Sequence, residues 1–319
     1  MATGLFRPAL GEVDMSVGPD EFILHQYEIS PFSEKVRVAL GIKQLAWRAC
    51  NQPSILPKPD LTRLTGGFRR IPVLQIGADL YFDSLFIIEE LERRAPTPTA
   101  FVAGPGMAGA VAPWSDGELF MTVVGLLFGG DWDVNEAFLK DRSELMGRPF
   151  DPAAMAAAAP QLAIDLRRHL DLLETQLGDG RAFLTGTGAD TLDAAVFCQI
   201  RFIRWGKGRA ETLLGDFPHL LAWEARVAAL GHGRRVDDVS GQAAVEIARA
   251  AAPAPIRDGG GAADLKPGDQ IRFKFHDANT PVLEATVMRA DARTLTVKPA
   301  ASEAGDIHLH FPRTIGAVV

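Results

Sequence analysis

The spacing of the hydrophobic residues changes twice along this 319-residue chain, and the change predicts three kinds of structure. Residues 1–20 form a lead-in without a clear period. Residues 21–98 alternate short strand-like and helix-like segments, which indicates a mixed α/β layer domain. Residues 105–250 repeat apolar positions every three or four residues, as one-sided helices do. Beyond a linker rich in Ala, Pro and Gly at 250–263, residues 264–319 alternate apolar and polar positions, which predicts a small β-barrel or sandwich of about five strands.

Turn and capping residues separate the predicted elements of the first region. Ser30 and Pro31 begin a helix after a short apolar strand, because serine caps helices well and proline suits the first helical position. Two later strands flank a turn that contains glycine and predict a hairpin. Asp83 and Ser84 then cap another helix. The predicted order of elements is therefore β-α-β-α-β-β-α.

Charge and composition exclude several classes of function. The formal net charge is −7 and the isoelectric point is about 5.5. Because a nucleic-acid-binding protein normally needs a basic face, we expect no nucleic-acid partner. The apolar segment at 120–128 is too short to span a bilayer, and residues 1–20 lack the pattern of a signal peptide. Cys50 and Cys198 form no CxxC pair, so we expect inert packing cysteines in a cytoplasmic protein without a membrane association.

Three short motifs of the first region carry the chemical signal. They are Ser-Pro-Phe at 30–32, Ile-Pro at 71–72 and Asp-Ser at 83–84. In this order the region resembles the N-terminal thioredoxin-like domain of glutathione transferases, the omega and zeta classes in particular. The omega class has Cys-Pro-Phe at the first turn, and zeta and related classes place a serine there. The Ile-Pro pair resembles the family's cis-proline signature, and the Asp-Ser pair resembles its acidic-Ser pair.

The resemblance covers roughly residues 21–235. The stretch Asp-Thr-Leu-Asp-Ala-Ala at 190–195 resembles the capping motif of the family's central helix. The fold implied is a thioredoxin-like α/β N-terminal domain (21–98), an all-α helical second domain (105–250) and a small all-β C-terminal domain (264–319), for which we recognise no family. The resemblance also implies a homodimer.

The resemblance implies glutathione as a co-substrate, and the motif residues fit its functional groups. Asp83 is placed to pair with the ammonium. Ser84 and the free N–H groups of the helix that it begins are placed to hold the γ-glutamyl carboxylate, because helix N-termini attract anions. Ile71, before a cis Pro72, would present its backbone to the cysteinyl unit like an added strand.

The remaining parts of the implied site rest on weaker signals. Lys58 resembles the omega-class lysine near the glycyl carboxylate, and Arg70 is the other candidate for that contact. Phe32 and Trp114 are candidates to line an apolar pocket for the second substrate, although aromatic residues at helical spacing usually belong to the core.

Ser30 is the predicted donor to the glutathione thiolate. A free thiol has a pKa of about 8.5, and lowering it by about two units needs about 2.7 kcal/mol, within reach of one charge-assisted hydrogen bond. Tyr27 is the alternative donor, because other transferase classes use a tyrosine at the end of this strand. Serine forms no mixed disulfide, so thiol-transfer chemistry is not expected. Capping alone is the other interpretation of Ser30.

The leading functional hypothesis is therefore a glutathione transferase that adds the thiolate to a small apolar electrophile. The alternatives are a non-catalytic binding or scaffold protein and a glutathione-dependent isomerase or lyase. We expect no metal cofactor. His308 and His310 would share one face of a strand, but without a neighbouring Cys or acidic cluster they are interpreted as an exposed strand face.

Overall fold

The computed structural model describes residues 21–132, 134–257 and 264–319. The predicted lead-in and residues 258–263 of the predicted linker lie outside the described residues. The first region has the predicted order of elements. These are β1 (Ile23–Gln26), α1 (Pro31–Ile42), β2 (Ala46–Asn51), α2 (Pro59–Thr65), β3 (Val73–Ile76), β4 (Asp79–Phe82) and α3 (Ser84–Arg94).

A helical region follows, as predicted. Its elements are α4 (Pro105–Pro113), α5 (Phe120–Leu126), α6 (Glu136–Met146), α7 (Pro152–Leu177), α8 (Thr191–Gly206), α9 (Arg209–Leu214) and α10 (Pro218–Ala229), with π-helical stretches at Trp114–Leu119 and Leu127–Asp131. Helix α8 starts at the predicted capping motif: Asp190 accepts from the backbone N–H of Leu192, and Asp193 accepts from that of Asp190. No helix among the described residues is long and apolar enough to cross a membrane.

The chain returns to the first region before residue 250. Strand β5 (Arg234–Arg235) pairs in parallel with β2, and α11 (Gly241–Ala250) packs against α2. The sequence predicted helix up to residue 250 and assigned it to the helical region. In the structure α11 belongs to the core beside the sheet, because its buried face of Ala244, Val245 and Ala248 contacts that core rather than the helical one.

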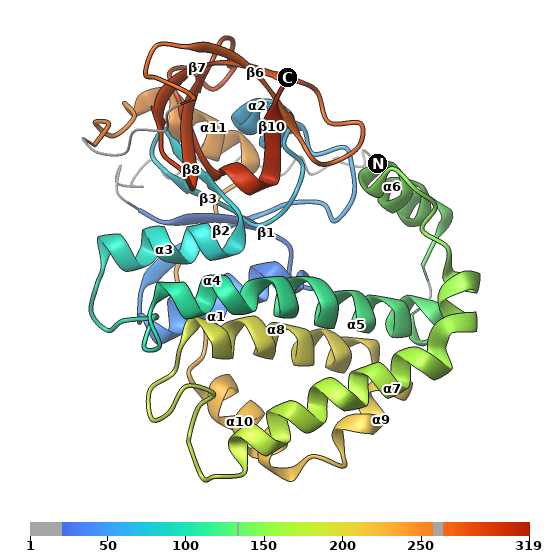
Figure 1. The fold of residues 1–319 in the computed structure, drawn as a ribbon. Coiled ribbons are helices and arrows are strands. Elements are labelled where there is room, and N and C mark those ends of the chain that lie inside the picture. Colours follow the sequence, from blue (N-terminus) through green and yellow to red (C-terminus); the bar gives the residue numbers. More distant parts are fainter. Residues whose placement is uncertain (1–20, 133, 258–263) are drawn as a thin grey trace, which may run out of the picture.

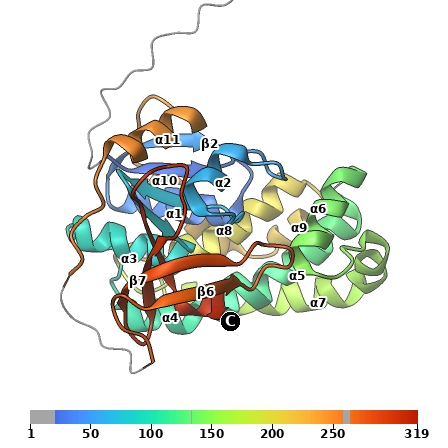
Figure 2. The same ribbon diagram turned by 90° about the horizontal axis from the view of Figure 1, so that it is seen from above.

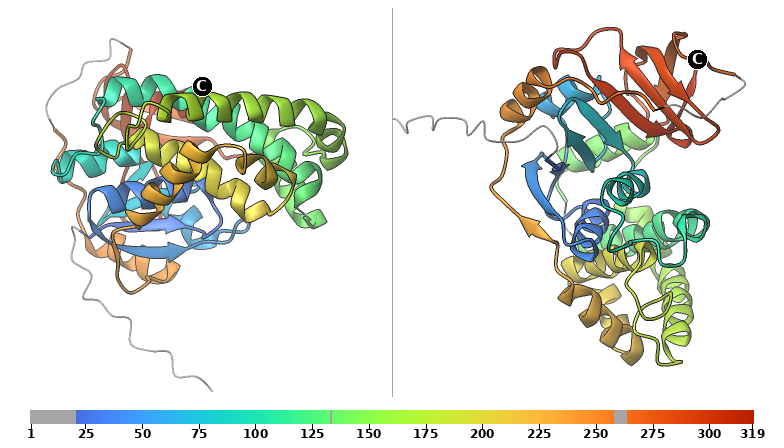
Figure 3. Two further views of the ribbon diagram at one scale, coloured as in Figure 1. Left: turned by 90° about the horizontal axis from the view of Figure 1, so that it is seen from below. Right: turned by 90° about the vertical axis from the view of Figure 1, so that its left-hand side faces the viewer.

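The C-terminal region contains five described strands, β6 (Gln270–Phe275), β7 (Leu283–Ala290), β8 (Thr294–Pro299), β9 (His308–Pro312) and β10 (Gly316–Val318). The all-β prediction is confirmed, but the strands close no separate barrel or sandwich. Strand β9 pairs in parallel with β4, and the strands form one ten-stranded sheet in the order β10-β6-β7-β8-β9-β4-β3-β1-β2-β5. The right panel of Figure 3 shows the C-terminal strands continuing the N-terminal ones.

Two hydrophobic cores lie on opposite faces of this sheet, because successive strand residues point to opposite sides. Leu24, Leu74 and Tyr81 face the core shared with α1, α3 and the helical region. Val73 and Phe82 face the second core, which contains α2, α11 and the C-terminal strands. Figure 1 shows α1 and α3 between the N-terminal strands and the helical region, and Figure 2, seen from above, shows α2, α11 and the strands β6 and β7 on the side away from the helical region.

Candidate functional site

A cavity of about 290 Å³ opens where the N-terminal sheet, α1 and α3 meet the C-terminal region. Six of the ten residues that the sequence predicted for the site line it, namely Phe32, Arg70, Ile71, Pro72, Asp83 and Ser84. Six other lining residues were not predicted, namely Phe68, Asp116, His276, Asp277, Thr314 and Ile315. The structure therefore brings most of the predicted glutathione set into one wall and adds an opposing wall.

The Ile-Pro and Asp-Ser motifs have the predicted local structure. The peptide bond between Ile71 and Pro72 is cis. Asp83 is the N-cap of α3, where its Oδ1 accepts from the N–H groups of Leu85 and Phe86 at 3.0 and 3.1 Å. Ser84 is the first residue of this helix and is buried. The cavity thus contains the N-terminus of an eleven-residue helix, which carries a partial positive charge.

Charged groups beneath the cavity control the state of Asp83. Burial raises the pKa of Asp83, and the nearby Lys35 ammonium opposes that rise. Lys35 is itself buried on α1 and forms an ion pair with Asp116 at 2.6 Å. The Lys35 ammonium thus acts on two carboxylates, through the ion pair with Asp116 and through its electrostatic effect on Asp83.

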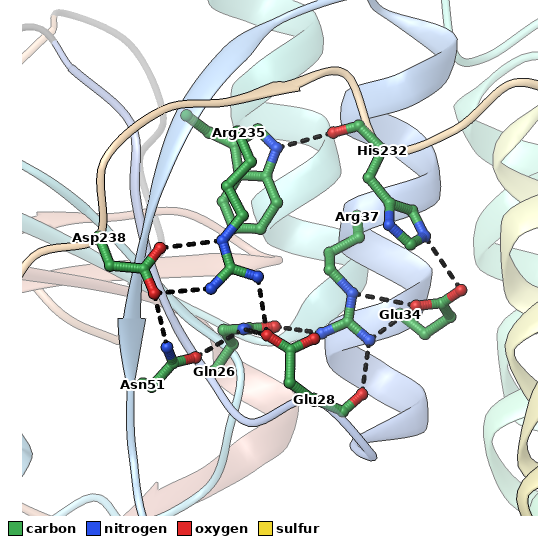
Figure 4. A network of polar contacts seen from close by, with 9 residues as sticks. Gln26, Glu28, Glu34, Arg37, Asn51, His232, Arg235 and Asp238 are labelled. Atoms are coloured by element: carbon green, nitrogen blue, oxygen red, sulfur yellow. Dashed lines mark hydrogen bonds and ion pairs between the residues drawn. The ribbon is translucent and has the colours of Figure 1, made fainter.

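A polar network fixes the turn between β1 and α1. Arg37, buried on α1, donates to the carbonyl oxygen of Glu28 at 2.8 Å and to the carboxylate of Glu34 at 2.6 Å. Arg235 reaches back from beyond the helical region to the Glu28 carboxylate at 2.7 Å, and His232 contacts Glu34 (Figure 4). The segment after α10 therefore holds the turn on which Ser30 lies.

Ser30 ends that turn as the N-cap of α1. Its Oγ accepts from the backbone N–H of Ser33 at 3.2 Å, and the side chain is buried. Ser30 is not among the described residues that line the cavity, whereas Phe32 is. Capping is the role that the structure displays, and a hydroxyl that accepts one hydrogen bond can still donate its own proton.

Three other predicted site residues also lie outside the cavity lining. Lys58 is buried, donates to the carbonyl oxygen of Arg69 at 3.0 Å, and lies 5.8 Å from the centre of the Tyr27 ring. Burial lowers the pKa of Lys58 to about 8. Trp114 donates to His169 Nδ1 at 3.1 Å at the edge of the helical core. The sequence predicted that Lys58 contacts glutathione, but in the structure its ammonium is buried within the protein. A pattern of residue types does not show such burial, because it depends on which segments pack around the side chain.

Four of the six unpredicted lining residues, His276, Asp277, Thr314 and Ile315, come from the C-terminal region and form the second wall of the cavity. Arg70 forms an ion pair with Asp277 at 2.5 Å, although the Arg70 side chain is 56% exposed. The backbone N–H of His276 donates to the carbonyl oxygen of Ile315 at 2.9 Å, which joins the two loops of this wall. The alternation in residues 264–319 predicted strands, but no signal in it indicated which surface their loops would cover.

Both cysteines are buried away from the cavity lining. Burial raises the pKa of Cys50 to about 12 and that of Cys198 well above its usual value. Neither forms a thiolate near neutral pH, and the expectation of packing cysteines is confirmed.

Comparison with known proteins identifies the family. Residues 24–99 match the glutathione S-transferase N-terminal domain, and residues 133–234 match a domain of unknown function. A GST-like protein from Pseudomonas syringae is similar over 94% of this chain and 99% of its own, with 33% sequence identity and a TM-score of 0.77. The chain belongs to the family of glutathione S-transferase-like proteins.

More distant members of this glutathione S-transferase-like family share the fold over part of the chain. The tau class glutathione S-transferase from mango is 18% identical, with 66% of this chain and 89% of the mango protein covered and a TM-score of 0.51. A glutathione S-transferase from Rhodospirillum rubrum F11 is 21% identical over 65% of this chain and 88% of its own, with a TM-score of 0.51. No curated protein matches the sequence.

Proposed function

We propose that this protein binds glutathione in the cavity described above and adds its thiolate to a small apolar electrophile, as a cytoplasmic glutathione transferase. One observation carries the proposal: Ile71 and Pro72 from one segment, and Asp83 and Ser84 from another, line the same cavity. Membership of the glutathione S-transferase-like family supports it. We keep the homodimer as part of the proposal, on the family resemblance alone.

The groups of glutathione are assigned to the wall by charge. Asp83 pairs with the ammonium, and the N-terminus of α3 at Ser84 holds the γ-glutamyl carboxylate. The backbone of Ile71 pairs with the cysteinyl unit. Arg70, exposed at the edge of the cavity, replaces Lys58 as the first candidate for the glycyl carboxylate, since the Lys58 ammonium is engaged by the Arg69 carbonyl oxygen.

The nucleophile in this proposal is the thiol of glutathione itself. Neither protein cysteine is ionised, as their raised pKa values show, so the protein supplies no thiolate of its own. A donor at the α1 turn and the N–H groups of that helix lower the pKa of the bound thiol. Phe32, Phe68 and Ile315 supply an apolar part of the cavity for the electrophile.

Calorimetric titration with glutathione tests the binding step. Asp83→Asn keeps the capping oxygen and removes the charge, so we expect a dissociation constant about 10–100-fold higher from the loss of one charged contact. Asp151→Asn is the matched control, because Asp151 caps α7 with the same pattern of two N–H donors on an exposed surface. An unchanged dissociation constant in Asp83→Asn would refute the pairing.

The pH dependence of glutathione binding provides a second test of Asp83. Its carboxyl must be ionised to hold an ammonium, and burial raises its pKa above the usual value. We therefore expect the affinity to fall with decreasing pH through that raised pKa, in wild type but not in Asp83→Asn. A parallel pH profile for the two proteins contradicts the assignment.

Turnover with a general aromatic electrophile tests Ser30. If Ser30 donates to the thiolate, Ser30→Ala lowers turnover about 100-fold and leaves glutathione affinity unchanged. Ser240→Ala is the matched control, because Ser240 caps α11 through the same contact, its Oγ accepting from the Ala243 N–H at 3.1 Å. Equal turnover in the two variants removes Ser30 from the chemistry. Activity only on a maleyl-type isomer would favour the glutathione-dependent isomerase. Glutathione binding without turnover, or no glutathione binding at all, would favour the non-catalytic binding or scaffold protein.

A further inference from the structure

Three potential ligand residues meet where the two halves of the sheet join. Asp79 is the first residue of β4, and His308 and His310 lie on β9. The parallel register pairs Asp79 with His308 and Tyr81 with His310, so all three potential ligands share one face of the sheet. One nitrogen or oxygen atom from each of the three lies within 4.8 Å of the others.

This arrangement corrects the interpretation of the two histidines as an exposed strand face. His308 is only 7% exposed, because β9 is an inner strand between β8 and β4. The acidic neighbour that the sequence did not show is Asp79, which lies 231 residues before His310.

The distances are close to those of a coordination sphere. His310 Nε2 lies 2.6 Å from Asp79 Oδ1, and His308 Nδ1 lies 3.8 Å from the same oxygen. Zinc–nitrogen and zinc–oxygen bonds of about 2.0–2.1 Å in a tetrahedron place ligand atoms about 3.3 Å apart. A metal ion therefore requires the His310–Asp79 contact to open by about 0.7 Å and the more distant ligand atoms, which lie within 4.8 Å of one another, to approach by up to about 1.5 Å. Side-chain movements of this size leave the strand pairing unchanged.

One polar atom of the cluster is unsatisfied without a cation. Within the described part of the chain, His308 Nδ1 is buried and has no hydrogen-bond partner. Asp79 is only 2% exposed, and burying a carboxylate is costly unless a positive charge or strong donors accompany it. We propose that Asp79, His308 and His310 bind a divalent transition metal of the Zn²⁺ type, with a water molecule as the fourth ligand.

The surroundings orient two of the three ligands, His310 and Asp79. Tyr81 stacks on the His310 ring with centroids 4.5 Å apart, and Thr296 Oγ1 lies 3.1 Å from His310 Nδ1. A hydroxyl can donate or accept a hydrogen bond, so Thr296 suits both states of the His310 ring. Without metal, Nε2–H of the ring donates to Asp79 and the hydroxyl donates to Nδ1. With metal on Nε2, the ring carries its proton on Nδ1 and donates it to the hydroxyl. The second carboxylate oxygen, Asp79 Oδ2, accepts from the backbone N–H of Ala254 at 2.7 Å.

A metal at this position links β9, β4 and the segment that leads to the C-terminal strands. Because it binds the folded arrangement of segments that are far apart in the sequence, it stabilises the folded state by mass action. We therefore expect the Tm of the full chain to rise with the concentration of free Zn²⁺.

The test is a titration of the full-length, metal-stripped protein with Zn²⁺ against a competing chelator. We expect one equivalent to bind to wild type. Asp79→Asn is the decisive variant, because the amide oxygen still accepts from Ala254 and the amide nitrogen can donate to His310, so the fold is kept while the charge is lost. We expect at least about 100-fold weaker Zn²⁺ binding in Asp79→Asn, and about 10–100-fold weaker binding in Thr296→Val. His219→Ala, which removes an exposed imidazole on α10, is the control and should bind like wild type.

Two results overturn the proposal. One is the absence of stoichiometric Zn²⁺ binding by wild type, and the other is equal affinity in wild type and Asp79→Asn. Co²⁺ substitution of wild type supplies a measurement that does not depend on any variant folding. Visible absorption bands of tetrahedral Co²⁺ at one equivalent support the site, and a spectrum identical to that of aqueous Co²⁺ contradicts it.

Discussion

The two halves of the ten-stranded sheet differ in how they are specified. Helices or a tight turn separate strands β1 to β4, and Ser30 and Asp83 cap α1 and α3 where the sequence predicted helix starts. Strands β6 to β10 follow one another almost without helices, and their alternation would suit many partners. One half can therefore be assigned from local signals, whereas the other acquires its position only through pairing with β4.

The C-terminal half of the sheet covers groups that the N-terminal half would otherwise expose. A strand edge without a partner exposes a row of N–H and C=O groups, and β9 covers that edge of β4. Phe68 and Phe82 of the first half pack against Phe275 and Phe311 of the second, with ring centroids 4.9 to 6.1 Å apart in three of these pairs. The same packing of the C-terminal half on the N-terminal half brings the second wall to the cavity.

Removal of the C-terminal half should have the largest effect. A chain that ends at Arg257 exposes the edge of β4 and the rings of Phe68 and Phe82. We expect aggregation or loss of cooperative unfolding, measured by sedimentation and thermal denaturation. A soluble truncated protein with one sharp transition would show instead that the two halves are independent domains, as the sequence alone suggested.

Removal of one ring from either half should have the next largest effect. Phe82→Ala and Phe311→Ala each remove a fully buried ring from the shared core, so we expect each to lower the free energy of unfolding by about 3–5 kcal/mol. Denaturant titration followed by tryptophan fluorescence and by circular dichroism measures both. A single transition that shifts in both variants supports one cooperative unit. Two transitions, with only one of them shifted in each variant, would show that the two halves unfold independently.

Loss of an ion pair between the halves should have the smallest effect. Arg293, on the C-terminal side, contacts Glu89 of α3 at 2.5 Å, but its side chain is 70% exposed. We expect Arg293→Ala to lower the free energy of unfolding by less than about 1 kcal/mol, because solvent screens exposed pairs. Arg167→Ala, which removes an exposed pair with Asp216 in the helical region, is the control and should cost a similar amount. A loss of several kcal/mol in Arg293→Ala alone would show that charge, not the shared core, joins the halves.

The candidate site divides in the same way. The sequence predicted the wall with Ile71, Pro72, Asp83 and Ser84, because those residues lie in turns and caps with local signatures. It did not predict the opposite wall, since Asp277 reaches Arg70 from 207 residues away. Lys58 was assigned from a resemblance of residue type, and only the packing around it shows that its ammonium is engaged inside the protein.

By itself the sequence determined the family, the order of the elements up to α3, the helical character of the region that follows, the caps of α1, α3 and α8, and the presence of C-terminal strands. These depend on contacts between residues a few positions apart, which leave a pattern in the chain. Only the tertiary structure decided that β9 pairs with β4, that α11 returns to α2, and that Asp79 meets His308 and His310. Alternation of apolar residues predicts that a strand has a buried face but does not identify its partner, because backbone hydrogen bonds between strands are the same for every sequence.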